Sequence, residues 1–114
     1  MFDYKKIELL IKENKIEKAQ KELSNLGNKY YKNDKYLILR SKIFYKNKLY
    51  YIAIDTLLIA LQFYKHEEIF ELLADIYKTI GNEPLSKKML QKDIRAEVVE
   101  NLKAQLSNIP KKNV

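Results

Sequence analysis

Cysteine is absent from the sequence, and turn residues are scarce: the 114 residues include two glycines and two prolines. Without cysteine the chain forms no disulfide and offers no thiolate to a metal. An antiparallel sheet of many short strands needs more turn residues than these, whereas long helices need few. Hydrophobic residues (46%) and charged residues (32%) occur in the proportions of a folded protein of one domain. The composition therefore favours a single all-α domain.

Signals for catalysis are also missing. His66 is the single histidine, and we expect it to be exposed at the start of a helix. Glu67, Glu68 and Glu71 cluster beside it, but no further metal-ligating residues accompany them. The sequence contains no nucleophile motif and no phosphate-binding glycine loop. It therefore predicts a protein without enzymatic activity, cofactor or metal site.

No stretch of the sequence is suited to a membrane. The most apolar segment, Leu49 to Phe63, is fifteen residues long and contains Asp55, so it is too short and too polar to span a bilayer. The first residues include Asp3 and Lys5 instead of the apolar core of a signal peptide. We expect a cytoplasmic protein that does not bind membranes.

Apolar residues at helical spacing predict six helices. The first five are expected over residues 2–13, 15–26, 35–46, 49–63 and 67–80. Gly27 and Gly81 suit the ends of the second and fifth helices, and Pro84 suits the first turn of the sixth. The apolar stripe of the sixth helix continues to Leu106, which predicts an elongated C-terminal helix up to Ser107. Whether that helix is continuous is open.

The apolar pattern repeats at intervals of 34 and 33 residues. Small residues of the second, fourth and sixth helices keep this interval, as do two columns of large residues. The three columns are Ala19, Ala53 and Ser86; Leu23, Leu57 and Leu90; and Leu10, Phe44 and Tyr77. An interval of this length is typical of stacked helix-turn-helix repeats, which need about three units for stability.

The segment SKIFYKNKLYYIAIDTLLIAL resembles the tetratricopeptide repeat. That family pairs a small residue and an aromatic in the first helix with Ala, a large residue and Ala in the second. The corresponding residues here are Ser41, Phe44, Ala53, Leu57 and Ala60. Two positions depart from the pattern, because Arg40 replaces a Leu and Asp93 replaces an Ala. The resemblance implies a solenoid of three hairpins with an elongated C-terminal capping helix over 1–109, followed by a short basic tail, 110–114.

The resemblance also implies a concave groove, lined by the first helix of each hairpin, that binds a peptide or helix of a partner protein. Transferred residue by residue, its lining is Glu8, Lys12, Lys35, Ile38, Lys42, Tyr45, Lys46, Glu71 and Asp75. The second unit is thus basic and aromatic and the third is acidic, which suits a partner of mixed charge. We therefore predict a protein–protein interaction scaffold or adaptor. The clamp for tail carboxylates of some family members is not reproduced, because Glu71 and Asp75 stand where cations are needed.

A second surface suggests self-association. The resemblance puts Tyr51, Ile52, Leu58 and Ile59 on the convex face, where polar residues are usual. Because an exposed apolar patch often marks an interface, these residues indicate a homodimer. The alternative is that another part of the same chain covers them.

The net charge of +7 raises nucleic acid as an alternative partner. Lysines and tyrosines interleave between Lys29 and Lys46, as they do on surfaces where bases stack. An acidic stretch over 64–83 interrupts the basic charge, and some tyrosines are needed for packing. Binding of single-stranded RNA is therefore the alternative function.

Overall fold

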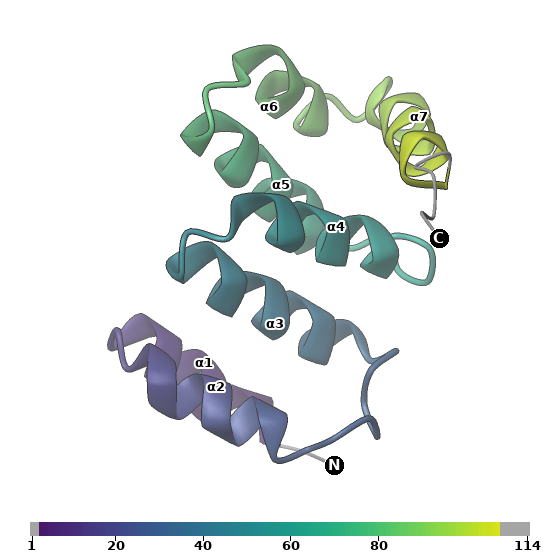
Figure 1. Ribbon diagram of the computed structural model, residues 1–114. Coiled ribbons are helices and arrows are strands. Elements are labelled where there is room, and N and C mark those ends of the chain that lie inside the picture. The colour runs from purple at the N-terminus through teal and green to yellow at the C-terminus, as the bar shows by residue number, and fades with distance from the viewer. Residues whose placement is uncertain (1–2, 108–114) are drawn as a thin grey trace, which may run out of the picture. The chain divides into compact units, whose positions relative to one another are not determined.

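The computed structural model describes residues 3–107, which form seven α-helices and no strand (Figure 1). The helices are α1 (Tyr4–Lys12), α2 (Ile16–Ser24), α3 (Asp34–Lys46), α4 (Tyr50–Ala60), α5 (Glu67–Thr79), α6 (Glu83–Met89) and α7 (Arg95–Ser107). The predicted all-α class is confirmed. Two compact units divide the chain, unit 1 (Met1–Lys65) with α1 to α4 and unit 2 (His66–Val114) with α5 to α7. The predicted tail 110–114 lies outside the described residues.

Helix α3 is the central element of unit 1, because it contacts α1, α2 and α4 (Figure 1). Its core residues accordingly lie on more than one side of the helix. They are Tyr36, Leu37, Ile38, Leu39, Ser41 and Ile43. Ser41 meets Ala53 of α4 where both side chains are fully buried, and Ser41 Oγ donates a hydrogen bond to the Ala53 carbonyl oxygen at 3.0 Å. The two small side chains allow close approach, and the hydrogen bond satisfies the buried hydroxyl.

Unit 2 contains the same contact, but here the alanine is on the first helix of the hairpin and the serine is on the second. Ala74 of α5 and Ser86 of α6 follow Ser41 and Ala53 by 33 residues. Here Ser86 Oγ donates to the Ala74 carbonyl oxygen at 2.8 Å, and both residues are buried. The small residues of the sequence repeat thus form a buried, hydrogen-bonded contact within each of these two hairpins.

The three hairpin turns share one backbone geometry. Each has a residue with positive φ at the repeat interval: Asn14 (60°), Lys48 (63°) and Gly81 (85°). The N–H of the next residue donates to the carbonyl five residues earlier, in the pairs Lys15–Leu10, Leu49–Phe44 and Asn82–Tyr77. This is a common way to end a helix, and it favours glycine at the left-handed position. The sequence interval therefore corresponds to a repeated local structure.

Lys48 holds this left-handed position at an energetic cost, because a residue with a Cβ pays about 1 kcal/mol there. We expect Lys48→Gly to raise the free energy of unfolding by about 0.5–1 kcal/mol, after the greater chain entropy of glycine is subtracted. Gly81→Ala should lower it by about 1 kcal/mol, purely through backbone strain, since nothing lies within 4 Å of the added Cβ. Urea unfolding measures both changes.

A matched control for Lys48→Gly is Lys21→Gly, at an exposed position inside α2. There glycine should destabilise by about 1 kcal/mol, because the backbone is helical. The turn geometry is refuted if the two lysine-to-glycine changes act in the same direction.

The elongated C-terminal helix predicted over 84–107, whose continuity the sequence left open, is broken into α6 and α7. Helix α6 ends at Met89, and the N–H groups of Leu90 and Gln91 donate to carbonyls three residues back instead of four. The chain turns before α7 begins at Arg95. The turn lets Arg95 stack on Phe70 of α5, with its guanidinium carbon 3.9 Å from the ring centroid. This contact lies at the start of α7, directly after the break.

The second column of the sequence repeat does not keep its burial in α6. Leu23 and Leu57 are buried, whereas the side chain of Leu90 is 58% exposed. Met89 is fully buried instead. Leu90 lies beyond the end of α6, because this helix is only seven residues long and ends at Met89. The equivalent leucines of unit 1, Leu23 and Leu57, lie within their helices and are buried.

Candidate functional site

Predicted partner-binding residues of the first two hairpins meet across α1 and α3. Lys42 Nζ lies 4.0 Å from Glu8 Oε2, and both side chains are partly buried. Lys35 Nζ lies 5.3 Å from the ring centroid of Tyr4. The two contacts run in the same order along both helices, so α1 and α3 lie parallel. We call this surface the α1–α3 face; it consists of Tyr4, Glu8, Lys12, Lys35, Lys42, Tyr45 and Lys46.

The remaining predicted residues of this face differ in accessibility. Lys12 and Lys46 are exposed at the ends of their helices. Tyr45 is partly buried and packs edge-on against Tyr50 of α4, with ring centroids 5.8 Å apart. Ile38 is only 2% exposed, so its predicted role in contacting a partner is wrong. Its burial follows from the central place of α3, which packs against three helices.

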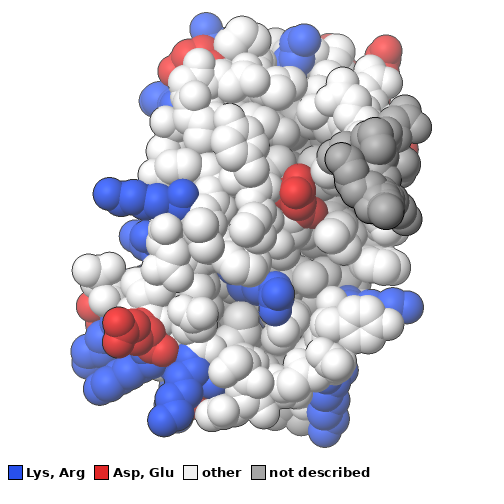
Figure 2. Space-filling view, viewed as in Figure 1, with Lys and Arg blue, Asp and Glu red and all other residues white. Residues whose placement is uncertain are grey.

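The acidic residues predicted for the third hairpin belong to unit 2. Glu71 and Asp75 are exposed and one turn apart on α5. Unit 1 has 14 basic and 7 acidic residues, a net charge of +7, and unit 2 has 8 of each, a net charge of zero. On the side shown in Figure 2, many charged residues of unit 1 gather at the lower left, around the turn between α1 and α2, and other basic residues lie at the lower right, whereas the surface between them is mostly uncharged. The whole net charge of the chain therefore resides in unit 1.

The predicted convex patch is exposed at three of its four residues. Tyr51, Ile52 and Ile59 are 70%, 48% and 45% exposed. Leu58 is 2% exposed, so its place in the patch is wrong; it lies one turn after the buried Ile54 on the inner side of α4. The homodimer inferred from the patch stays a prediction.

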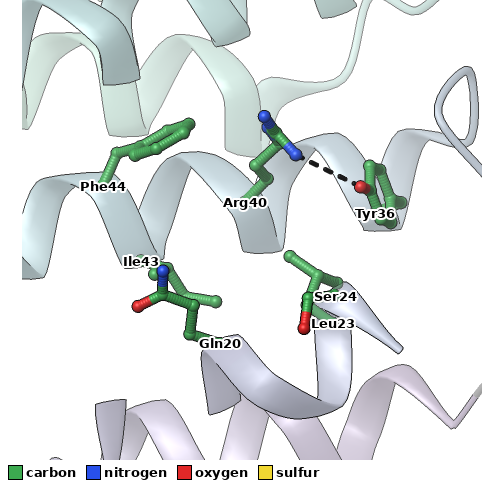
Figure 3. A pocket seen from close by; sticks show the side chains of 7 residues that line it. All are labelled: Gln20, Leu23, Ser24, Tyr36, Arg40, Ile43 and Phe44. Atoms are coloured by element: carbon green, nitrogen blue, oxygen red, sulfur yellow. Dashed lines mark hydrogen bonds between the residues drawn. The ribbon is translucent and has the colours of Figure 1, made fainter. Parts of the chain in front are cut away.

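A hollow of about 150 Å³ between α2 and α3 was not predicted from the sequence (Figure 3). Its lining consists of Gln20, Leu23, Ser24, Tyr36, Arg40, Ile43 and Phe44. Leu23 and Ile43 are buried and make its inner wall apolar, whereas Gln20 and Ser24 are exposed on α2. The hollow is therefore an apolar depression with a polar edge.

Arg40 is the charged residue of this hollow. Its Nη1 donates to Tyr36 Oη at 3.3 Å, and its guanidinium carbon lies 5.2 Å from the ring centroid of Phe44. Figure 3 shows the three side chains along α3, opposite those of α2. The one sequence signal for this site was Arg40, which stands where the pattern of the tetratricopeptide resemblance has Leu.

Two carboxyl groups have perturbed pKa values. The pKa of Glu67 is lowered, first by the hydrogen bond from Arg95 and further by the charges of Arg95 and Lys92, although partial desolvation opposes the shift. Burial raises the pKa of Asp55 on α4. Arg95 Nη1 lies 3.0 Å from Glu67 Oε2, and this pair joins the start of α7 to the start of α5. We therefore assign the Glu67–Arg95 pair a structural role.

Within residues 3–107, no group of three or more histidine, aspartate or glutamate side chains is placed to hold a metal ion. No helix in the same range has both the length and the apolar composition needed to cross a bilayer. Comparison with known proteins finds no matching family model, curated protein or solved structure. The tetratricopeptide resemblance thus rests on the repeated residues of this chain.

Proposed function

We propose that the protein is a protein–protein interaction module that binds a polypeptide segment of a partner along the α1–α3 face. The observation that carries this proposal is the parallel arrangement of α1 and α3, with Glu8 beside Lys42 and Lys35 beside Tyr4. Side chains from two consecutive hairpins therefore form one continuous surface. An extended or helical segment lying across it would contact both hairpins.

The charge of unit 1 favours an acidic segment as the ligand. Lys12, Lys35, Lys42 and Lys46 contribute four positive charges to the face, against the single carboxylate of Glu8. An acidic partner would be drawn to this surface by long-range attraction, which accelerates association more than it strengthens the final complex. Binding is therefore expected to slow as the salt concentration rises.

The proposal includes a tetratricopeptide-like stacking of the three hairpins. It is supported by the shared turn geometry at Asn14, Lys48 and Gly81. It is also supported by the serine–alanine contact, which recurs 33 residues later with donor and acceptor exchanged. Repeats of this kind offer a side chain from each unit to an elongated ligand.

A pull-down from lysate of the source organism tests the proposal. The wild-type protein is compared with Lys42→Glu/Tyr45→Ala, which reverses a charge and removes a ring from the α1–α3 face. We expect the double variant to lose at least one protein that the wild type captures. That protein should bind purified wild-type protein at least tenfold more tightly than it binds the double variant, a difference of about 1.4 kcal/mol. Lys18→Glu, an exposed charge reversal on α2, should retain the partner.

Circular dichroism must show that the double variant keeps its fold, because Tyr45 packs against Tyr50. If the folded double variant captures the same proteins with the same affinities, the α1–α3 face is not the binding surface.

One observation supports single-stranded RNA binding as a second candidate function. Lys32 Nζ lies 5.5 Å from the ring centroid of Tyr31 and 5.7 Å from that of Phe63, and both rings are exposed. Exposed rings beside a cation can stack on bases. Tyr36, which belonged to the same predicted series, is buried and unavailable. Only part of the lysine–tyrosine series is therefore accessible to RNA.

Fluorescence anisotropy with oligouridine distinguishes this second function. If it is correct, affinity falls steeply with salt and drops at least severalfold in Tyr31→Ala/Phe63→Ala, since each stacked base contributes about 1–3 kcal/mol. Salt-independent binding, or an unchanged affinity of the double variant, excludes it.

A further inference from the structure

We propose that the hollow between α2 and α3 is a second contact site for the partner, which receives an aliphatic side chain flanked by aspartate or glutamate. The inference rests on the proposed protein-binding function and specifies the chemistry of the ligand. It concerns a surface distinct from the α1–α3 face, because none of the residues that line the hollow belongs to that face.

The size and lining of the hollow suit an aliphatic side chain. Its volume is about 150 Å³, and an apolar cavity of about that volume accommodates benzene in another protein. Leu23 and Ile43 form the inner wall, and the ring of Phe44 lies at one end (Figure 3). A leucine or isoleucine side chain placed there would exchange water for apolar contacts. This burial supplies the attractive part of the interaction.

Arg40 adds selectivity for a carboxylate. Its guanidinium group is held between the Tyr36 hydroxyl and the Phe44 ring, so its position is largely fixed before a ligand arrives. No carboxylate of residues 3–107 forms an ion pair with it. One hydrogen bond to Tyr36 leaves most of its five N–H donors for another acceptor. A carboxylate next to the bound aliphatic residue would satisfy these donors in a two-pronged contact.

The net charge of unit 1 selects an acidic polypeptide over a basic one. Unit 1 carries +7, and a lysine or arginine beside the aliphatic residue would face Arg40 at short range. Gln20 on the opposite edge can exchange hydrogen bonds with a backbone, and Ser24 Oγ, which donates to the Lys21 carbonyl oxygen at 2.9 Å, can accept one. The predicted ligand is therefore a leucine-type residue within an acidic segment of the partner chain.

Two-dimensional NMR of the full-length protein tests this assignment with three blocked tripeptides. The probe is acetyl-Glu-Leu-Glu-amide, and the controls are acetyl-Gln-Leu-Gln-amide and acetyl-Glu-Ala-Glu-amide. We expect the probe to shift the signals of Ser24, Arg40 and the methyl groups of Leu23 and Ile43, with a Kd on the order of 1 mM. Each control should bind at least about threefold more weakly, because one lacks the charge and the other the apolar group.

Two variants test whether the preference for glutamate comes from Arg40. In Arg40→Gln, the preference for the probe over its glutamine control should shrink to the small part that the remaining charge of unit 1 supplies, whereas Lys18→Gln removes the same charge from another position on α2 and should preserve the difference. The fold of both is checked by circular dichroism. The assignment is overturned if the probe causes no shifts around the hollow at tens of millimolar, or if Arg40→Gln prefers glutamate as strongly as Lys18→Gln does.

The outcome is separable from that of the pull-down. Loss of binding in Lys42→Glu/Tyr45→Ala with no tripeptide effect would leave the α1–α3 face in place and refute the hollow. Tripeptide binding that depends on Arg40, together with unchanged capture by the double variant, would support the hollow and refute the α1–α3 face.

Discussion

Replacing Met89 by alanine is expected to lower the free energy of unfolding by about 3 kcal/mol. Met89 is the last residue of α6 and is fully buried in the structure. Its truncation removes several apolar atoms and leaves a cavity, because the rigid backbone of the α5–α6 hairpin can collapse only in part. Urea unfolding followed by circular dichroism measures the loss.

The neighbouring substitution Leu90→Ala is the matched control, since Leu90 is 58% exposed. It should change the free energy of unfolding by less than about 0.5 kcal/mol. The sequence repeat alone predicts the reverse order, because Leu90 occupies the column of Leu23 and Leu57. A larger loss for Leu90→Ala than for Met89→Ala would show that Leu90, and not Met89, is the core residue at this end of α6.

The sequence predicted the helices where local signals define them. Five predicted helices match α1 to α5 to within a few residues at each end, because their apolar spacing and their turns are local properties. The sixth did not, since no glycine or proline separates Met89 from Arg95. The step of five residues from Met89 to Ile94 was the one local sign of a break. The contacts of Arg95 with Glu67 and Phe70 bridge 28 and 25 residues, and such contacts leave no local pattern.

Like the helices, the candidate sites were predicted from the sequence only in part. The interval that defines the hairpins also placed Glu8 and Lys42 one repeat apart, and the structure brings them together. Exposure was less predictable, because it depends on every helix that packs around a residue. Ile38 and Leu58 were assigned to surfaces and are both buried. The hollow beside Arg40 was missed because a space between side chains of two helices has no sequence signature beyond the unexpected arginine.

The repeat predicts a large effect on stability when a small residue between paired helices is enlarged. Ala53→Leu is expected to lower the free energy of unfolding by about 3 kcal/mol. Ala53 is fully buried, and its carbonyl oxygen accepts the hydrogen bond of Ser41 at 3.0 Å. Three additional carbon atoms on α4 cannot fit unless α3 moves away, which would lengthen that hydrogen bond and disturb the contacts of α3 with α1 and α2. Overpacking and a weakened buried hydrogen bond therefore act together.

Ala104→Leu is the control, because Ala104 is exposed on α7 and leucine is nearly as good a helix former as alanine. It should change stability by less than about 0.5 kcal/mol. The small-residue column predicts that Ala19→Leu in α2 is also costly, since Ala19 is fully buried at the equivalent position. If Ala53→Leu is tolerated as well as Ala104→Leu, α3 and α4 do not approach closely at this position. The repeat would then describe the sequence without specifying the packing of α3 against α4.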